Sequence, residues 1–181
     1  MFNIVLLEPE IPSNTGNIGR TCLLTGSRLH LIEPMGFILN DKNLKRAGMD
    51  YWNDLDYTVY DSWRDFCEKT REFLYIGGVP GNNNKDKESR PRLWMATTKA
   101  KKTYCEASFK DGDYIMFGKE SAGIPEEILM ANKGSAIRIP MAKSTRSLNL
   151  SNSAAVILYE ALRQNDFNGL ELYGQLHEHT W

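Results

Sequence analysis

The sequence contains no hydrophobic run long enough to cross a lipid bilayer. Its longest apolar runs, "IVLL" and "AAVIL", fall far short of the roughly 20 residues that a transmembrane helix needs. The first residues carry no basic segment and reach Glu8 early, so we expect no secretory signal peptide. A strong charge of one sign is also missing. The formal net charge of −1 neither demands nor excludes a nucleic-acid partner.

Cysteine and histidine are scarce as well. The three cysteines are an odd number without a C-x-x-C pair, so we expect reduced thiols in a cytoplasmic protein. The three histidines, His30, His177 and His179, are not spaced with cysteines or carboxylates in the manner of a metal site. We therefore predict no metal, and we expect the last two histidines to be solvated tail residues.

Three common catalytic or nucleotide-binding motifs are absent. In "GDYIMFGKES" the two glycines are separated by five residues instead of four, and Glu120 stands where a phosphate loop needs Ser or Thr for magnesium. "NTGNIG" lacks the first two closely spaced glycines of the dinucleotide fingerprint. The chain has no G-x-S-x-G elbow, so its many serines are poor candidates for hydrolase nucleophiles.

The 181 residues instead show strand-like segments alternating with helix-like ones. The strands are predicted over 2–9, 28–34, 73–78, 93–98, 113–118 and 135–140, and the helices over 14–26, 41–48, 62–72, 125–132 and 150–165. This alternation predicts one α/β domain over 1–165, with a mostly parallel sheet flanked by helices, followed by a tail over 166–181. The stretch 78–92, rich in Gly, Pro and Asn, is predicted to be an exposed loop or insertion.

Three polar clusters each follow a predicted strand, where ligands bind in parallel sheets. The first is "EPEIPSNTGNIGR", with Ser13 or Asn14 expected as the N-cap of a helix that ends at Gly26. Asn14, Asn17 and Arg20 recur every three residues on one side of that helix. This pattern fits either a capped helix with one surface arginine or a phosphate site at a helix N-terminus.

The second cluster, "FGKESAGIPEEI", holds Glu120 on a tight loop between Gly118 and Gly123, which allow backbone conformations closed to other residues. It fits a plain strand-to-helix turn as well as a site. The third cluster opens "STRSLNLSNSAAVILYEALRQ" and holds more small polar residues than one helix cap needs. We expect Ser151 or Asn152 to cap the helix, and a polar ligand to occupy the surplus groups.

Together, "NTGNIGR", "FGKESAGIP" and "RIPMAKSTRSLNLSNSAAVILYEALRQ" resemble the three motifs of the SPOUT class of RNA methyltransferases. With "LEPEIPSNTGNIGRTC", "IEPMGF" and "RAGMDYW", the chain looks like the small single-domain tRNA 2′-O-methyltransferases that act on the wobble nucleotide, position 34. The resemblance runs from Met1 to about Gln164. It implies a Rossmann-like α/β fold with a C-terminal trefoil knot, a cytoplasmic homodimer, S-adenosylmethionine as cofactor and the tRNA anticodon stem-loop as partner. Ordinary topology rules alone would argue against a knot.

The resemblance also assigns site residues. The catalytic residues it implies are Arg20, Asn14, Glu120 and Asn149. The cofactor-binding residues are Ala96, Thr97, Gly118, Glu120, Ile139, Pro140, Ser147 and Leu148. The RNA-binding residues, predicted mainly from the clustering of basic residues, are Asn17, Lys42, Lys45, Arg46, Lys143 and Arg146. The implied reaction is attack of a ribose 2′-hydroxyl on the sulfonium methyl, giving S-adenosylhomocysteine. Because a guanidinium stays protonated, we expect Arg20 to orient a phosphate and to stabilise negative charge on the 2′-oxygen. We expect Asn14 and Asn149 to hold Arg20 and the ribose.

Several alternatives stay open at this stage. The basic clusters, including Arg138 and a third patch at Lys99, Lys101 and Lys102, fit phosphate contacts or plain solvated charge. Tyr51 and Trp52 fit base stacking or core packing. Residues 154–162 are apolar on nearly all sides, which predicts one face against the sheet and another against a partner subunit. The target could be another tRNA or rRNA site, or the chain could be a non-catalytic RNA-binding dimer.

Overall fold

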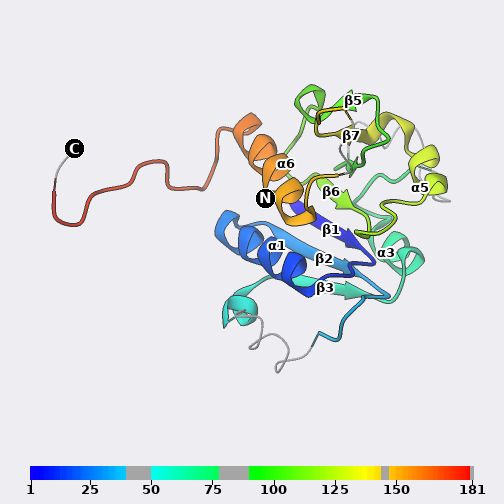
Figure 1. Cartoon of the computed structure of the whole chain (residues 1–181), viewed down its shortest axis with the longest axis horizontal. Coiled ribbons are helices and arrows are strands. Elements are labelled where there is room, and N and C mark those ends of the chain that lie inside the picture. Colours follow the sequence, from blue (N-terminus) through cyan, green and yellow to red (C-terminus); the bar gives the residue numbers. More distant parts are fainter. Residues whose placement is uncertain (40–49, 78–89, 144–146, 180–181) are drawn as a thin grey trace.

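The protein forms a parallel sheet with helices on both faces, as a computed structural model shows (Figure 1). The structure describes residues 1–39, 50–77, 90–143 and 147–179. The strands are β1 (Asn3–Leu7), β2 (Arg28–Ile32), β3 (Tyr57–Tyr60), β4 (Leu93–Ala96), β5 (Lys102–Thr103), β6 (Tyr114–Phe117) and β7 (Ala136–Arg138). The helices are α1 (Pro12–Thr25), α3 (Trp63–Thr70), α5 (Glu126–Ala131) and α6 (Leu150–Gln164), with short 3-10 turns η1 (Asp50–Asp54), η2 (Tyr104–Glu106) and η3 (Lys133–Ser135).

The seven described strands lie in the order β3-β2-β1-β6-β4-β7-β5, and every pairing between them is parallel. The predicted α/β class with a parallel sheet is therefore confirmed. The strand predicted over 73–78 is wrong in its described part, 73–77, where Tyr75 forms an isolated bridge with Arg92 but no strand. The two-residue edge strand β5 was not predicted because it is too short to show a period. The helix predicted over 41–48 lies outside the described residues, and the trefoil knot stays a prediction.

The two faces of the sheet bury two separate apolar clusters. Side chains alternate along each strand, so Ile4 and Leu6 of β1 face α1 and α6, while Val5 and Leu7 face α3. The same alternation holds in β6, where Ile115 joins the first cluster. Burial on both faces explains why these strands are apolar almost without interruption.

The helix ends correct two capping predictions. Helix α1 begins at Pro12 with Ile11 as its N-cap, which offers no side-chain hydrogen bond, so neither Ser13 nor Asn14 caps it. Its predicted end is confirmed, because Gly26 adopts a left-handed φ of 63°. Helix α6 is capped by Asn149, whose side chain accepts from the backbone N–H groups of the two residues predicted as caps.

The remaining features concern the cysteines and the tail. Cys22 and Cys67 are buried, Cys105 is exposed, and none forms a disulfide. Burial raises the pKa of the Cys22 and Cys67 thiols to about 12. After α6, Phe167 and Leu170 pack against the core, and the following residues extend away from the body (Figure 1). Within the described ranges, no helix has the length and apolar character needed to cross a membrane.

Candidate active site at the carboxyl edge of the sheet

A cavity of about 680 Å³ opens where the loops after β1, β4, β6 and β7 meet the start of α6. This is the carboxyl edge of the sheet. The cavity lies beside the neighbouring strands β1 and β6: β2 and β3 follow on the β1 side, and β4, β7 and β5 follow on the β6 side. Ligands in open α/β sheets bind at such a switch point. The cavity is lined by Ile11, Asn14, Ala96, Thr97, Thr98, Lys99, Phe117, Gly118, Lys119, Glu120, Ser121, Ala122, Gly123, Ile139, Met141, Ser147, Leu148, Asn149, Leu150, Ser153 and Ile157.

The loop after β6 is a tight turn that only glycine permits at two positions. The Gly123 N–H donates to the Lys119 carbonyl over 2.8 Å, and Gly123 has a φ of +72°. A Cβ on Gly118 would lie 2.1 Å from the carbonyl carbon of Gly123. The two glycines therefore serve different needs: Gly123 supplies a left-handed conformation, whereas Gly118 permits close approach of two backbone segments.

Two glutamates exchange hydrogen bonds between this loop and the loop after β1. The Glu120 carboxylate accepts from the Glu10 N–H at 2.9 Å and the Ile11 N–H at 3.3 Å. In return, the Glu10 carboxylate accepts from the Ser121 hydroxyl at 2.7 Å and the Ser121 N–H at 2.8 Å. The hydroxyl bond is the main reason that the pKa of Glu10 lies below its ordinary value. These bonds fix the two loops against each other beside the cavity, which Glu120 and Ser121 help to line.

A neighbouring ion pair strengthens the same junction. Lys119 Nζ lies 2.6 Å from Glu8 Oε2, and both side chains are about one-third exposed. Glu8 holds a φ of 51°, uncommon for a residue other than glycine. The pairing raises the pKa of Lys119, so this ammonium stays charged beside the cavity.

Three predicted catalytic residues form one line of side-chain hydrogen bonds. Asn149 Nδ2 donates to Asn14 Oδ1 over 3.0 Å, and Asn14 Nδ2 donates to Glu120 Oε1 over 3.0 Å. The direction of the line is set by α6. Its free backbone N–H groups require the Asn149 oxygen as acceptor, so the Asn149 amide nitrogen must face Asn14. Asn14 then turns its own nitrogen to the carboxylate.

Most of the predicted cofactor residues line the cavity together with this triad. They are Ala96, Thr97, Gly118, Glu120, Ile139, Ser147 and Leu148. Pro140 does not line it. Ser153 and Ile157 line it but were not predicted. They follow Asn149 at intervals of four, so helical spacing from the predicted cap could have found them.

Arg20 is exposed on α1 and is not among the residues that line the cavity, and Asn17 is exposed on the same helix. In this chain the amides of Asn14 and Asn149 bond to each other and to Glu120, and the expected hold of these asparagines on Arg20 stays a prediction. The aromatic ring of Tyr51 instead lies 5.9 Å from the Arg20 guanidinium carbon.

The predicted RNA-binding residues are only partly placed. Lys42, Lys45, Arg46 and Arg146 lie outside the described residues, and Lys143 is exposed. In the third basic patch, Lys99 pairs with Glu126 at 2.8 Å, while Lys102 Nζ lies 5.4 Å from the Trp94 ring. Trp52 is only 3% exposed and belongs to the core, so of its two alternatives, base stacking and core packing, the structure supports core packing.

The fold and the cavity define a doubly wound α/β domain with a ligand site at its switch point. Residues 1–159 match the model of the SpoU rRNA methylase family, and the chain belongs to that family. The tRNA (cytidine(34)-2′-O)-methyltransferase of Escherichia coli K12 is 46% identical over 173 residues, which are 95% of this chain and 99% of that protein. The protein of the same name from Saccharophagus degradans is 46% identical over 170 residues, covering 93% and 99%.

Solved structures agree with this membership. A structure that concerns 2′-OH methylation of C/U34 on tRNA has a TM-score of 0.76 and 38% identity, covering 92% of this chain and 97% of that one. The SpoU methyltransferase AviRb from Streptomyces viridochromogenes, solved with AdoMet, has a TM-score of 0.72 at 21% identity and covers 91% and 60%. The second comparison supports the fold alone.

Proposed function

We propose that the protein methylates the ribose 2′-hydroxyl of nucleotide 34, a cytidine or modified uridine, in tRNA. The observation that carries this proposal is the line of hydrogen bonds Asn149–Asn14–Glu120 in the lining of a cavity at the carboxyl edge of the sheet. It joins residues from all three motifs that the resemblance singled out. The names of relatives that match nearly the full chain supply the substrate.

The cavity suits S-adenosylmethionine in size and character. Small-molecule sites typically enclose about 300–1,000 Å³ and combine apolar walls with a few placed polar groups. Here Ile139, Leu148 and Ile157 provide apolar surface, and Thr97 and Ser147 provide hydroxyls. The bound cofactor supplies an electrophilic methyl group on a sulfonium, and the reaction yields S-adenosylhomocysteine without a metal.

The residues of the chain then have distinct tasks. The triad holds the loops after β1 and β6 and the start of α6 in one arrangement, which keeps the binding groups preorganised. Arg20 stays cationic because a guanidinium does not lose its proton at neutral pH. On α1, with its donors unpaired to any carboxylate of the described residues, it would orient the phosphate beside nucleotide 34 and stabilise negative charge on the 2′-oxygen.

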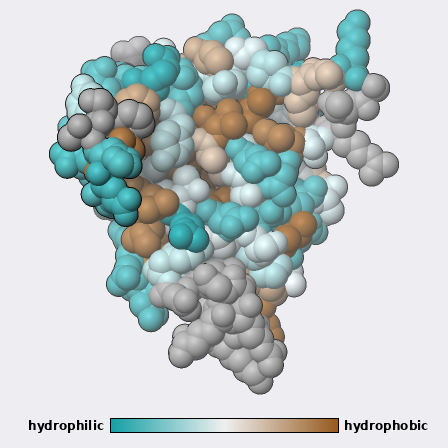
Figure 2. Space-filling model, turned by 60° about the vertical axis from the view of Figure 1, so that its left-hand side comes forward, coloured by the Kyte–Doolittle hydropathy of each residue, from teal (hydrophilic) through white to brown (hydrophobic). Residues whose placement is uncertain are grey.

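The proposal includes the cytoplasmic homodimer that the resemblance implies. Leu24 on α1 is 70% exposed, and Val156 and Tyr159 on α6 are 38% and 48% exposed. These two helices lie side by side on one face of the sheet (Figure 1). Hydrophobic patches of this kind break the hydrophilic surface in Figure 2, and such patches favour association. Sedimentation of the purified protein tests the dimer directly.

Nucleoside mass spectrometry tests the substrate. In tRNA from cells that lack the protein, ribose methylation at position 34 should disappear, and the purified protein with S-adenosylmethionine should restore it. Arg20→Ala should lose turnover while binding the cofactor normally, whereas Arg64→Ala, an exposed arginine on α3, should be unaffected. Unchanged methylation at position 34 would refute the substrate. Restored methylation at another tRNA or rRNA site would identify a different target, and tRNA binding without methyl transfer would identify a non-catalytic dimer.

A further inference from the structure

The positively charged side chain of Arg20 lies over the aromatic ring of Tyr51. The Arg20 guanidinium carbon lies 5.9 Å from the centre of the Tyr51 ring, within the range of a cation–π contact. The Tyr51 hydroxyl donates to the carbonyl of Gly16, one helical turn before Arg20. Tyr51 is thus attached to the backbone of α1 at its hydroxyl end while its ring face meets the guanidinium.

The position of Tyr51 is set by the packing of η1 on α1. Figure 1 shows η1 beside that helix. A Cβ on Gly19 would lie 2.8 Å from Trp52 Cζ3 and 3.0 Å from a methyl of Leu55, so any larger residue would push η1 away. Gly19 therefore lets an aromatic turn lie against the helix beside Arg20.

The chemistry of the tyrosine suits a fixed support. Burial is the main reason that the pKa of Tyr51 lies above its ordinary value, while the positive charge of Arg20 acts in the opposite direction. The hydroxyl consequently remains a neutral donor to Gly16. A long arginine side chain has many rotamers, and a ring along one side of the guanidinium removes those that point toward the ring.

We propose that Tyr51 is a positioning residue that holds the Arg20 guanidinium in the orientation needed for methyl transfer. The proposal rests on the function proposed above for Arg20. It gives Tyr51 a role in holding Arg20 and not in base stacking. Misplacing a catalytic group by about 1 Å can reduce a rate about 100-fold. Loss of the Tyr51 ring should therefore reduce turnover even in molecules that remain folded.

The test is a double-mutant cycle on the full-length protein with tRNA and S-adenosylmethionine. Tyr51→Leu should lower kcat about tenfold or more and leave the KM for S-adenosylmethionine unchanged, and Tyr51→Phe, which keeps the ring, should restore most of the turnover. In an Arg20→Ala background, Tyr51→Leu should have no further effect on residual activity. Trp52→Phe is the matched control, because Trp52 packs on Gly19 in the same turn. It should lower the melting temperature without a selective loss of kcat.

The outcomes separate the two proposals. Loss of turnover in Arg20→Ala with normal turnover in Tyr51→Leu would overturn the positioning role and leave the proposed function standing. Equal proportional losses from Tyr51→Leu in both backgrounds would show a structural role only. Wild-type turnover in Arg20→Ala would overturn both proposals. If no methyl transfer occurs at all, the Nε–H resonance of Arg20 still decides the contact: it should shift in Tyr51→Leu through loss of the ring current, and an unmoved resonance would overturn it.

Discussion

The side-chain amide of Asn149 donates a hydrogen bond of 3.0 Å to the side-chain carbonyl of Asn14, 135 residues earlier in the chain. The oxygen of the same amide caps α6 by accepting from the Ser151 and Asn152 N–H groups. One side chain therefore starts the last helix and also orders the site. Because the cap fixes which end of the amide faces Asn14, the geometry of the site depends on where α6 begins.

Asn149→Asp separates these two tasks. A carboxylate can still cap α6 and is favoured at a helix N-terminus, but it cannot donate to Asn14. We expect Asn149→Asp to keep the cap and to weaken cofactor binding and turnover together, about tenfold or more. Asn149→Ala should lose the cap as well, at about 1 kcal/mol of stability. Calorimetric titration with S-adenosylmethionine and thermal unfolding measure the two effects. Normal cofactor affinity in Asn149→Asp would show that the hydrogen bond from Asn149 to Asn14 has no role in cofactor binding.

Glu120→Gln tests the hydrogen bonds by which Glu120, in the loop after β6, holds the loop after β1. The carboxylate accepts three hydrogen bonds, from the Glu10 and Ile11 N–H groups and from Asn14 Nδ2. A glutamine has one acceptor oxygen and an amide that only donates, so at least one of these donors loses its partner. We expect a loss of about 1–2 kcal/mol in the free energy of unfolding, measured by urea titration. Glu127→Gln, at an exposed position on α5, is the control and should change stability by less than about 0.5 kcal/mol.

The sequence predicted the sheet more completely than the contacts within the site. Strands buried on both faces give apolar runs, and β1, β2, β4 and β6 could be read from these. Polar residues after strands also indicated which loops meet, because carboxyl ends share one edge of a parallel sheet. These patterns depend on residues near one another in the sequence, so they can be recognised without knowledge of the folded structure.

Contacts that depend on distant residues could not be predicted in the same way. The cap of α6 was assigned two or three residues too late, since "SLNLSN" contains several residues able to cap and the hydrogen bond from Asn149 to the distant Asn14 cannot be read from local spacing. Arg20 was expected beside Asn14 and Asn149 because the resemblance to the family implied it. The neighbour that it actually has, Tyr51, comes from η1, and no local spacing relates the two.

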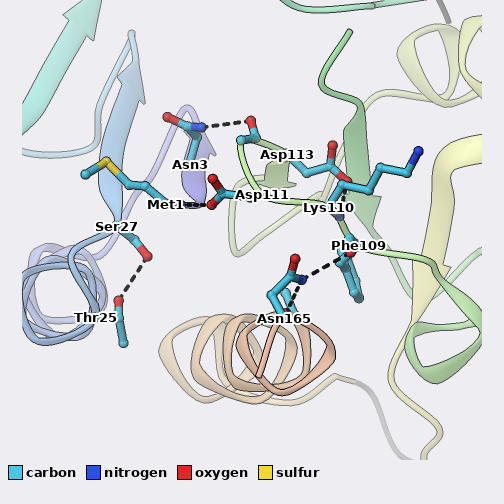
Figure 3. Close-up of polar contacts among 11 residues, drawn as sticks. Met1, Asn3, Thr25, Ser27, Phe109, Lys110, Asp111, Asp113 and Asn165 are labelled. Atoms are coloured by element: carbon cyan, nitrogen blue, oxygen red, sulfur yellow. Dashed lines mark hydrogen bonds and ion pairs between the residues drawn. The ribbon is translucent and has the colours of Figure 1, made fainter. Parts of the chain in front are cut away.

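A buried carboxylate at the opposite edge of the sheet has only structural partners. Asp113 is 1% exposed and accepts from the Arg92 N–H and the Trp94 indole, both at 2.8 Å. It also accepts from the Lys110 N–H at 3.0 Å (Figure 3). Asp113→Asn would turn an amide donor toward at least one of these donors. We expect a loss of about 2–3 kcal/mol in the free energy of unfolding, with little change in cofactor affinity per folded molecule.

The matched control for that substitution lies two residues away. Asp111 pairs with the amino group of Met1, and both groups are mostly exposed (Figure 3). Exposed ion pairs contribute little, so Asp111→Asn should lower stability by less than about 1 kcal/mol. Urea titration of both variants under one condition measures the difference. Equal effects of the two substitutions would show that burial of Asp113 does not govern its contribution.

His30 should make the stability of the protein dependent on pH. Its ring is buried, with Nδ1 2.9 Å from the Tyr60 hydroxyl and Nε2 3.1 Å from Asn3 Oδ1. Because Asn3 Oδ1 can only accept, Nε2 carries the proton and Nδ1 accepts from Tyr60. Asn3 in turn donates to the Gly112 carbonyl (Figure 3). Burial, and secondarily the charge of Arg28, lowers the pKa of His30 from 6.5 to about 3.

The unfolded chain consequently binds one more proton than the folded chain between pH 6.5 and about 3. Stability due to the neutral ring is fully present above pH 6.5 and is lost as the pH falls through this window, at up to about 1.4 kcal/mol per pH unit. His30→Gln cannot titrate, so its unfolding free energy should fall less steeply than that of the wild type. Urea titrations at a series of pH values measure the difference in slope. His177→Gln, at an exposed tail position, should keep the wild-type slope, and parallel curves for His30→Gln and the wild type would show that His30 is already protonated in the folded protein.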